Sequence, residues 1–92
     1  MATLESKIRV PEGVLFRDVG GEAVLLNTET GKYYGLDPVG TRMWALLNEH
    51  GQAGPAYRAL LNEYDVTAEQ LEQDLLALVA VLASHGLLQV EG

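Results

Sequence analysis

The sequence predicts an α+β fold in which a three-stranded antiparallel meander is followed by three helices, in the order βββααα. Three short strand-like runs are separated by glycine-containing turns at 20–21 and 28–31. The pair Asp37-Pro38 then ends the strand region and starts a helix, and a turn near 65–66 separates two further helical segments. This order is typical of a winged helix-turn-helix-like domain.

The predicted meander consists of strands over residues 14–19, 22–27 and 32–36. Gly20-Gly21 supplies the positive φ values of a tight hairpin turn between the first two strands. A type I turn closed by Gly31 in the left-handed region folds the third strand back on the second. The first and third strands are therefore the free edges of the sheet.

The first predicted helix begins directly after the meander. Asp37 is a good N-cap, and Pro38 suits the first helical position because the N–H that it lacks would be unpaired there. Apolar residues follow the helical period from Val39 to Leu47, and Gly51 is placed to end the helix.

Two more helices follow. The second opens near Gly54-Pro55 and is short and amphipathic. Thr67-Ala68-Glu69-Gln70 matches the capping-box pattern, in which the first and last residues satisfy each other's backbone donors, and it predicts the start of the third helix. This helix should run to His85, where Gly86 stops it, and the apolar tail at 87–90 should pack back on the core.

A chain of 92 residues makes one domain, and a hydrophobic content of 48% is ample for one modest core. Residues 1–13 end in Pro11 and Gly13 and are expected to form a loose N-terminal arm, so that the domain covers residues 14–92. The absence of cysteine excludes a disulfide framework and suits a cytoplasmic location. The most apolar segment, residues 75–83, is too short to span a membrane.

Charge argues against nucleic acid as a partner. Six basic and thirteen acidic residues give a net charge of −7, and residues 59–92 contain six acids and no Lys or Arg. The helix that would enter the major groove in a winged-helix protein carries Glu69, Glu72 and Asp74. It would therefore repel a phosphate backbone.

The sequence also lacks the residues of an active site or a cofactor site. His50 and His85 each occupy the last turn of a predicted helix, where an imidazolium interacts favourably with the helix dipole. Two histidines without HxxxH or ExxH spacing do not make a metal site. Ser6 and Ser84 lack a nucleophile-elbow context. We therefore expect no catalytic residue, no metal and no cofactor.

The third helix has more apolar surface than a core requires. At about 100° per residue, one stripe forms the core face, and it consists of Leu71, Leu75, Leu78, Val79 and Leu82. The surplus lies on two flanks, Asp74-Ala77-Val81 and Leu76-Ala80-Ala83, whose small side chains would let an extended backbone approach closely. The second helix, the C-terminal tail or a homodimer could equally cover this surface, and the sequence leaves open which flank faces the third strand.

Peptide binding by strand addition fits these features. Tyr33 and Tyr34 must point to opposite faces of their strand, so at most one of them is buried against the helices. An extended peptide that paired with residues 32–36 would gain main-chain hydrogen bonds and could insert side chains between this strand and the third helix.

The ordered motifs of the chain resemble those of the PqqD-like family. They are Leu26-Asn27, Thr30-Gly31, Tyr33/Tyr34, Leu36-Asp37 and Trp44-Ala45-Leu46-Leu47, followed by Tyr64-Asp65-Val66, Asp74 and Gly86-Leu87-Leu88. The resemblance covers residues 12–90. No single motif is specific, and it is the ordered set that carries the resemblance.

Members of this family look like RiPP recognition elements, which are small non-catalytic domains that bind the leader segment of a ribosomally made precursor peptide and present it to a modifying enzyme. The resemblance implies that a leader adds as a strand to residues 32–36 and lies in a cleft with the third helix. The implied peptide-binding residues are Lys32, Tyr33, Tyr34, Gly35, Leu36, Asp74, Ala77, Leu78 and Val81. In coenzyme PQQ synthesis the partner is a radical S-adenosylmethionine enzyme, and stand-alone relatives serve lasso peptides and other products.

Two other functions stay open at this point, a winged-helix regulator and a homodimeric protein interaction module. Salt-sensitive binding to duplex DNA would indicate the regulator. A salt-insensitive dimer would indicate the module. The motifs do not single out one pathway or one precursor peptide.

Overall fold

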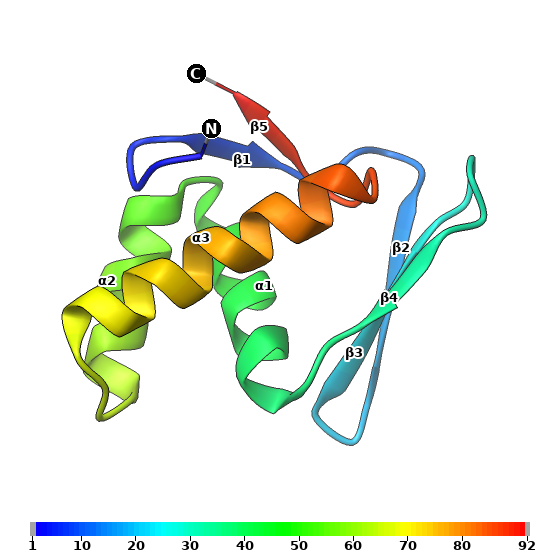
Figure 1. The fold of residues 1–92 in the computed structure, drawn as a ribbon. Coiled ribbons are helices and arrows are strands. Elements are labelled where there is room, and N and C mark those ends of the chain that lie inside the picture. Colours follow the sequence, from blue (N-terminus) through cyan, green and yellow to red (C-terminus); the bar gives the residue numbers. More distant parts are fainter. Residues whose placement is uncertain (1, 92) are drawn as a thin grey trace.

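The computed structural model describes residues 2–91 and confirms the predicted order of three antiparallel strands followed by three helices (Figure 1). The elements are β1 (Lys7–Arg9), β2 (Val14–Val19), β3 (Glu22–Asn27), β4 (Tyr33–Gly35), α1 (Pro38–His50), α2 (Ala53–Glu63), α3 (Ala68–Ser84) and β5 (Gln89–Glu91). The meander β2-β3-β4 stands to one side of the helices, and a second sheet, β1-β5, lies above them in Figure 1.

Local turn chemistry forms the meander. Gly20 and Gly21 have φ angles of 66° and 88°, as a tight hairpin turn requires, and the Gly21 N–H donates to Asp18 Oδ1 at 2.8 Å. In the second turn, Asn27 Oδ1 accepts hydrogen bonds from two backbone N–H groups, and Gly31 has a φ of 77°. Both predicted turns are confirmed.

The third strand of the meander is shorter than predicted, because β4 covers only Tyr33–Gly35. Its pairing with β3 nevertheless continues by one residue at each end. The Asn27 N–H donates to the Lys32 carbonyl, and the Leu36 N–H donates to the Ala23 carbonyl, both at 2.8 Å. The whole predicted segment is therefore held against β3.

The first two helices follow their predicted signals closely. At the start of α1 the Gly40 N–H donates to Asp37 Oδ1 at 2.7 Å, with Pro38 as the first helical residue. Gly51, with a φ of 67°, ends this helix as predicted. The second helix begins at Ala53, one residue before the predicted start.

Only half of the predicted capping box forms at the start of α3. The Gln70 N–H donates to Thr67 Oγ1 at 3.2 Å. The Gln70 side-chain amide instead donates to Asp74 Oδ1 at 2.8 Å, and no hydrogen bond within residues 2–91 joins the Gln70 side chain to the Thr67 N–H. One side-chain cap and an acid in the first turn thus start this helix.

The N-terminal segment is not the loose arm that the sequence suggested. Its strand β1 pairs antiparallel with β5 at the other end of the chain. Ser6 and Ile8 are buried, and the Ile8 N–H donates to the Gly51 carbonyl at 2.8 Å. The segment therefore belongs to the folded domain. Met1 and Gly92, the outer limits of the two expected segments, lie outside the described residues.

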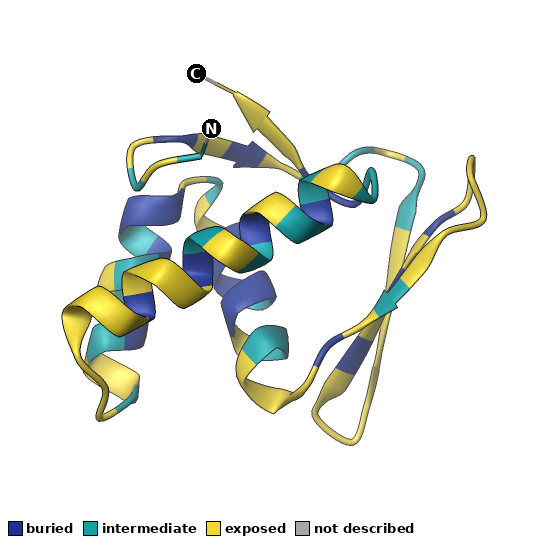
Figure 2. Ribbon diagram, in the orientation of Figure 1, coloured by how far each residue is buried: buried dark blue, intermediate teal, exposed yellow. Residues whose placement is uncertain are grey.

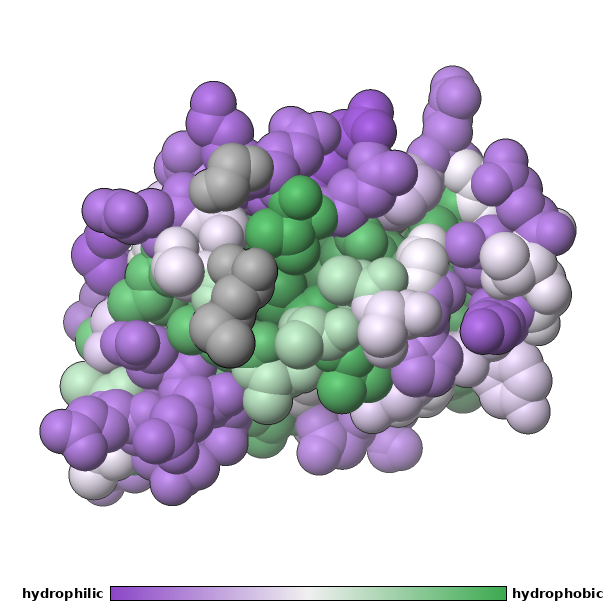
Figure 3. Space-filling view, turned by 45° about the horizontal axis from the view of Figure 1, so that its top comes forward, coloured by the Kyte–Doolittle hydropathy of each residue, from purple (hydrophilic) through white to green (hydrophobic). Residues whose placement is uncertain are grey.

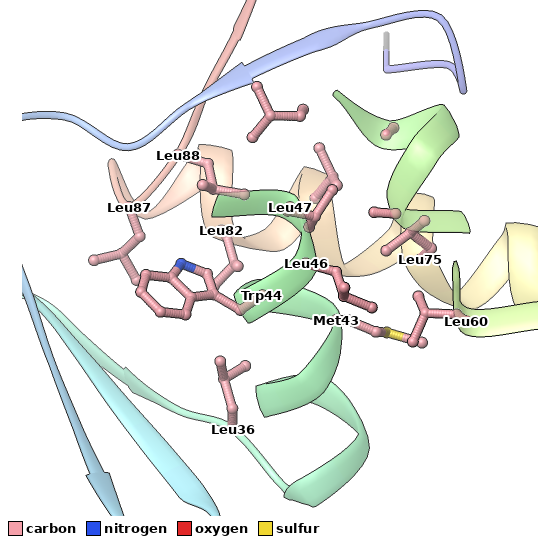
Figure 4. Packing of buried hydrophobic residues seen from close by; sticks show 14 of the residues in the cluster. Leu36, Met43, Trp44, Leu46, Leu47, Leu60, Leu75, Leu82, Leu87 and Leu88 are labelled. Carbon is pink, nitrogen blue, oxygen red and sulfur yellow. The ribbon is translucent and has the colours of Figure 1, made fainter. Parts of the chain in front are cut away.

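The core lies where the helices meet the inner face of the meander (Figure 4). Trp44 of α1 is buried there, with its ring centroid 4.5 Å from that of Phe16 in β2. Leu87 and Leu88 are also buried, so the tail packs back on the core at these two residues, whereas Gln89 and Val90 are exposed in β5. Leu71, Leu75, Val79 and Leu82 of the predicted α3 stripe are buried, whereas Leu78 is half-buried.

The meander has an inner face toward the helices and an outer face toward solvent. Burial alternates residue by residue along β3, as expected for a strand with one covered face (Figure 2). Tyr34 lies opposite the buried Leu25, and Tyr33 lies opposite the exposed Leu26. Only Tyr34 therefore points inward, as the alternation predicted.

Candidate functional site

The free edge of β4 offers backbone hydrogen-bonding groups to an extended partner. In an antiparallel pair, residues that exchange hydrogen bonds with the neighbouring strand alternate with residues that do not. Lys32 and Leu36 are bonded to β3, and Tyr34 lies midway between them in the same register. Tyr33 and Gly35 therefore turn their N–H and C=O groups away from β3, toward the open edge.

The Tyr34 ring identifies the flank of α3 that faces the meander. It lies against His85, with ring centroids 5.4 Å apart and ring planes at 63°. Residues four, seven and eleven positions before His85 share its side of the helix. The α3 wall, as we call this face, consists of Asp74, Leu78, Val81 and His85. Of the two flanks left open by the sequence, the one that contains Asp74 and Val81 therefore lies on the side of α3 that meets β4 at His85.

The α3 wall combines half-buried apolar side chains with an exposed acid. Leu78 and Val81 are half-buried, whereas Asp74 and the neighbouring Ala77 are exposed. Hydrophobic surface extends across the side of the molecule on which α3 lies, between hydrophilic margins (Figure 3). Such a surface suits apolar side chains of a ligand, with the carboxylate at its border.

The predicted residues of the third strand fall into two groups. Tyr34 packs against the core, and Leu36 is only 5% exposed, so the Leu36 side chain belongs to the core and is not available to a ligand. Lys32, Tyr33 and Gly35 are exposed. The expectation that all five residues offer contacts is thus wrong for the Leu36 side chain, because Leu36 lies opposite the buried Ala23 on the inner face of the meander.

His85 is a residue of this site that the sequence did not point to. Its Nδ1 lies 2.8 Å from the Val81 carbonyl, consistent with the expected interaction at a helix C-terminus. The contact with Tyr34 gives it a second role, because it joins β4 to the end of α3. Its position four residues after Val81 was the signal in the sequence that could have revealed it.

A bidentate ion pair lies away from this site, between α1 and α2. Arg42 Nε and Nη2 each donate to a carboxylate oxygen of Glu63 at 2.7 Å. This bidentate hydrogen bonding lowers the pKa of Glu63 and raises that of Arg42. The pair joins α1 to α2 and includes no residue of the α3 wall.

Within residues 2–91, no group of three or more His, Cys, Asp or Glu side chains could hold a metal ion. No helix in this range is long and apolar enough to cross a membrane. The described site thus consists of a strand edge, apolar side chains and a carboxylate.

Residues 22–88 match the protein family described as coenzyme PQQ synthesis protein D (PqqD). The chain belongs to the PqqD family. The matched region contains β3, β4 and all three helices, so it includes both sides of the candidate site. Among curated proteins, no sequence matches this PqqD-family chain.

Two solved structures are similar to this PqqD-family chain. The first, TbiB1 in complex with the TbiA(beta) leader peptide, is 36% identical, with a TM-score of 0.83 over 88% of this chain and 94% of TbiB1. The second, lasso peptide synthetase B1 complexed with the leader peptide, is 23% identical, with a TM-score of 0.80 over 90% of this chain and 98% of that chain. At this lower identity the second structure shows the fold alone.

Proposed function

We propose that this chain is a non-catalytic recognition protein that binds the leader segment of a ribosomally made precursor peptide and presents it to a modifying enzyme. Membership of the PqqD family and similarity to TbiB1, which was solved with a leader peptide, support this proposal. The observation that carries it is the open edge of β4 beside the α3 wall, because an extended peptide needs both a strand to pair with and a surface for its side chains.

Main-chain pairing accounts for only part of the expected affinity. Tyr33 and Gly35 each offer one N–H and one C=O, so an added strand can form four hydrogen bonds with them. At about 0.5–1.5 kcal/mol net for each bond, these contribute roughly 2–6 kcal/mol. A micromolar complex requires about −8 kcal/mol, and association has its own entropic cost. Side chains of the leader must therefore supply the rest.

The α3 wall is where we propose that those side chains bind. Burial of one Leu- or Val-sized side chain contributes about 1.5–3 kcal/mol, so two apolar anchors against Leu78 and Val81 would close the gap. Asp74 takes part in no ion pair within residues 2–91 and would accept a basic leader residue. Ala77 leaves room beside it for the leader backbone.

The proposed binding residues come from the third strand of the meander, from the α3 wall and from its neighbour Ala77. They are Lys32, Tyr33, Tyr34, Gly35, Asp74, Ala77, Leu78, Val81 and His85. Leu36 contributes by holding the edge strand in place. We further propose that the protein acts in the cytoplasm and that the receiving enzyme is of the radical S-adenosylmethionine type. The choice of enzyme class rests on the resemblance given in the sequence analysis, because the partner in coenzyme PQQ synthesis is of this type.

A titration of the ¹⁵N-labelled chain with a candidate leader peptide tests this function. Amide shifts should cluster on Tyr33–Gly35 and on the α3 wall, and a scrambled peptide of the same composition should cause none. Shifts confined to basic residues outside the site, such as Lys7 and Arg9, would contradict the proposal. Shifts at β4 that depend on protein concentration without any peptide would indicate a homodimer through the same edge.

A further inference from the structure

The outer face of the meander carries apolar surface that the proposed peptide site does not use. Cross-strand pairing places Leu15 beside Leu26 and Arg17 beside Val24 on this face. The outer patch, as we call it, consists of Leu15 (58% exposed), Val19 (65%), Val24 (41%), Leu26 (36%) and Tyr33 (72%). The solvated face of an antiparallel sheet is normally polar. Here the apolar side chains of the patch are exposed, as is most of the meander (Figure 2).

The outer patch is hollowed and surrounds one cation, Arg17. A depression of about 640 Å³ is lined by residues of β2 and β3, which are Leu15, Phe16, Arg17, Val19, Val24 and Leu26. Arg17 takes part in no ion pair within residues 2–91. The patch is therefore complementary to an apolar surface that also carries a carboxylate.

The outer patch is continuous with the open edge of β4, because Tyr33 belongs to both. A strand that paired with this edge would lie about 4.8 Å from β4. Every second side chain of that strand would point to the outer face, next to Tyr33 and Gly35. A bound leader would thus extend the outer patch.

The outer patch alone is smaller than a standard protein interface, so it needs the added area of the leader. Its side chains expose on the order of a few hundred Å². A standard protein interface buries about 800 Å² on each partner. A partner that contacted both the patch and the outward side chains of the leader would gain contact area only when the leader is bound.

We infer that the outer patch is the docking surface for the modifying enzyme, which contacts it together with the outward side chains of the bound leader. This inference rests on the proposed function in leader presentation. A second copy of the chain is a poorer occupant, because each chain carries a net charge of −7 and like charge opposes association. The enzyme would offer an apolar surface with a carboxylate opposite Arg17.

The double variant Leu15→Thr, Val19→Thr tests the inference. Threonine is β-branched and suits a strand but reduces the apolar surface, and neither position lies on β4. The matched control is Val39→Thr, Val66→Thr, which changes two exposed apolar side chains outside the patch. Calorimetry would measure the affinity of each protein for the leader and, with leader bound, for the enzyme that modifies the same precursor.

The inference predicts that the patch variant keeps its leader affinity within about twofold and loses at least tenfold in enzyme affinity, whereas the control loses neither. Unchanged enzyme affinity in a variant that still binds leader would overturn the inference and leave the proposed function intact. Failure of the wild-type chain to bind any leader would overturn the proposed function and the inference together. A wild-type dimer that the patch variant abolishes would overturn the inference in favour of a second copy.

Discussion

Asn27 joins three parts of the domain, and its replacement by alanine tests how the two sides of the candidate site are held together. Its Oδ1 accepts hydrogen bonds from the backbone N–H groups of Glu29 and Thr30, at 2.9 and 3.2 Å. Its Nδ2 donates to the Gly86 carbonyl at 2.9 Å. The first two bonds shape the turn before β4, and the third ties the meander to the end of α3.

The expected loss of stability follows from the exposure of these groups. Asn27 is only 7% exposed, so its bond to Gly86 is shielded from water. Glu29 and Thr30 are exposed, so water can replace the side chain at their N–H groups. Three bonds at about 0.5–1.5 kcal/mol each, discounted for this exposure, give a loss of about 2 kcal/mol for Asn27→Ala. In a domain of this size the melting temperature should fall by roughly 8–16 °C.

Urea unfolding followed by circular dichroism measures this loss. Thr28→Ala is the matched control, because it changes the adjacent residue and removes one exposed hydrogen bond to the Gly13 carbonyl. The control should lose well under 1 kcal/mol. A free energy of unfolding for Asn27→Ala within about 0.3 kcal/mol of wild type would refute the reasoning.

Two further predictions concern stability. Gly86→Ala should lower the free energy of unfolding by at least 1–2 kcal/mol. The reason is that Gly86 has a φ of 70° and an added Cβ would lie 2.8 Å from Asn27 Nδ2, so wild-type stability in urea would contradict it. Glu63→Gln should be less stable than wild type at pH 7, because the ion pair with Arg42 lowers the pKa of Glu63. The difference should begin to shrink as the pH falls below the ordinary carboxyl value of 4.5 and should be lost as the pH falls through the lowered pKa. Urea midpoints at pH 7 and pH 3 measure this effect, and an equal difference at both would argue against a stabilising ion pair.

The parts of the fold that depend on local chemistry could be predicted from the sequence. Gly20-Gly21 and Gly31 allow backbone angles that few other residues adopt, so they mark the turns. Asp37-Pro38 marks the start of α1 because both residues suit the unpaired N–H groups of a helix end. These signals need no distant partner.

The pairing of β1 with β5 could not be predicted in the same way. Each strand has only three residues, and Ile8 meets Val90 from the opposite end of the chain. Nothing local in residues 1–13 distinguishes a short edge strand from a loose segment. The apolar tail after α3 was recognisable, but its partner strand was not.

The divergence of the two tyrosines could be predicted from the sequence, but the flank of α3 that faces the meander could not. Strand alternation required Tyr33 and Tyr34 to diverge, which they do. The choice between the two flanks of α3 depends on how the helix packs against the meander, and the contact of Tyr34 with His85 decides it. The burial of Leu36 likewise depends on the tertiary position of the chain between β4 and α1.

The central claim is that a leader peptide pairs with the open edge of β4. The leader affinity of two Gly35 variants tests it most directly. Gly35→Pro removes an N–H that points to this edge, whereas Gly35→Ala keeps the N–H and adds a Cβ that meets nothing within 4 Å. With both variants folded by circular dichroism, the proline variant should bind leader roughly 2- to 12-fold more weakly than the alanine variant, as the loss of one hydrogen bond requires. Equal affinity of the two variants would contradict pairing at β4.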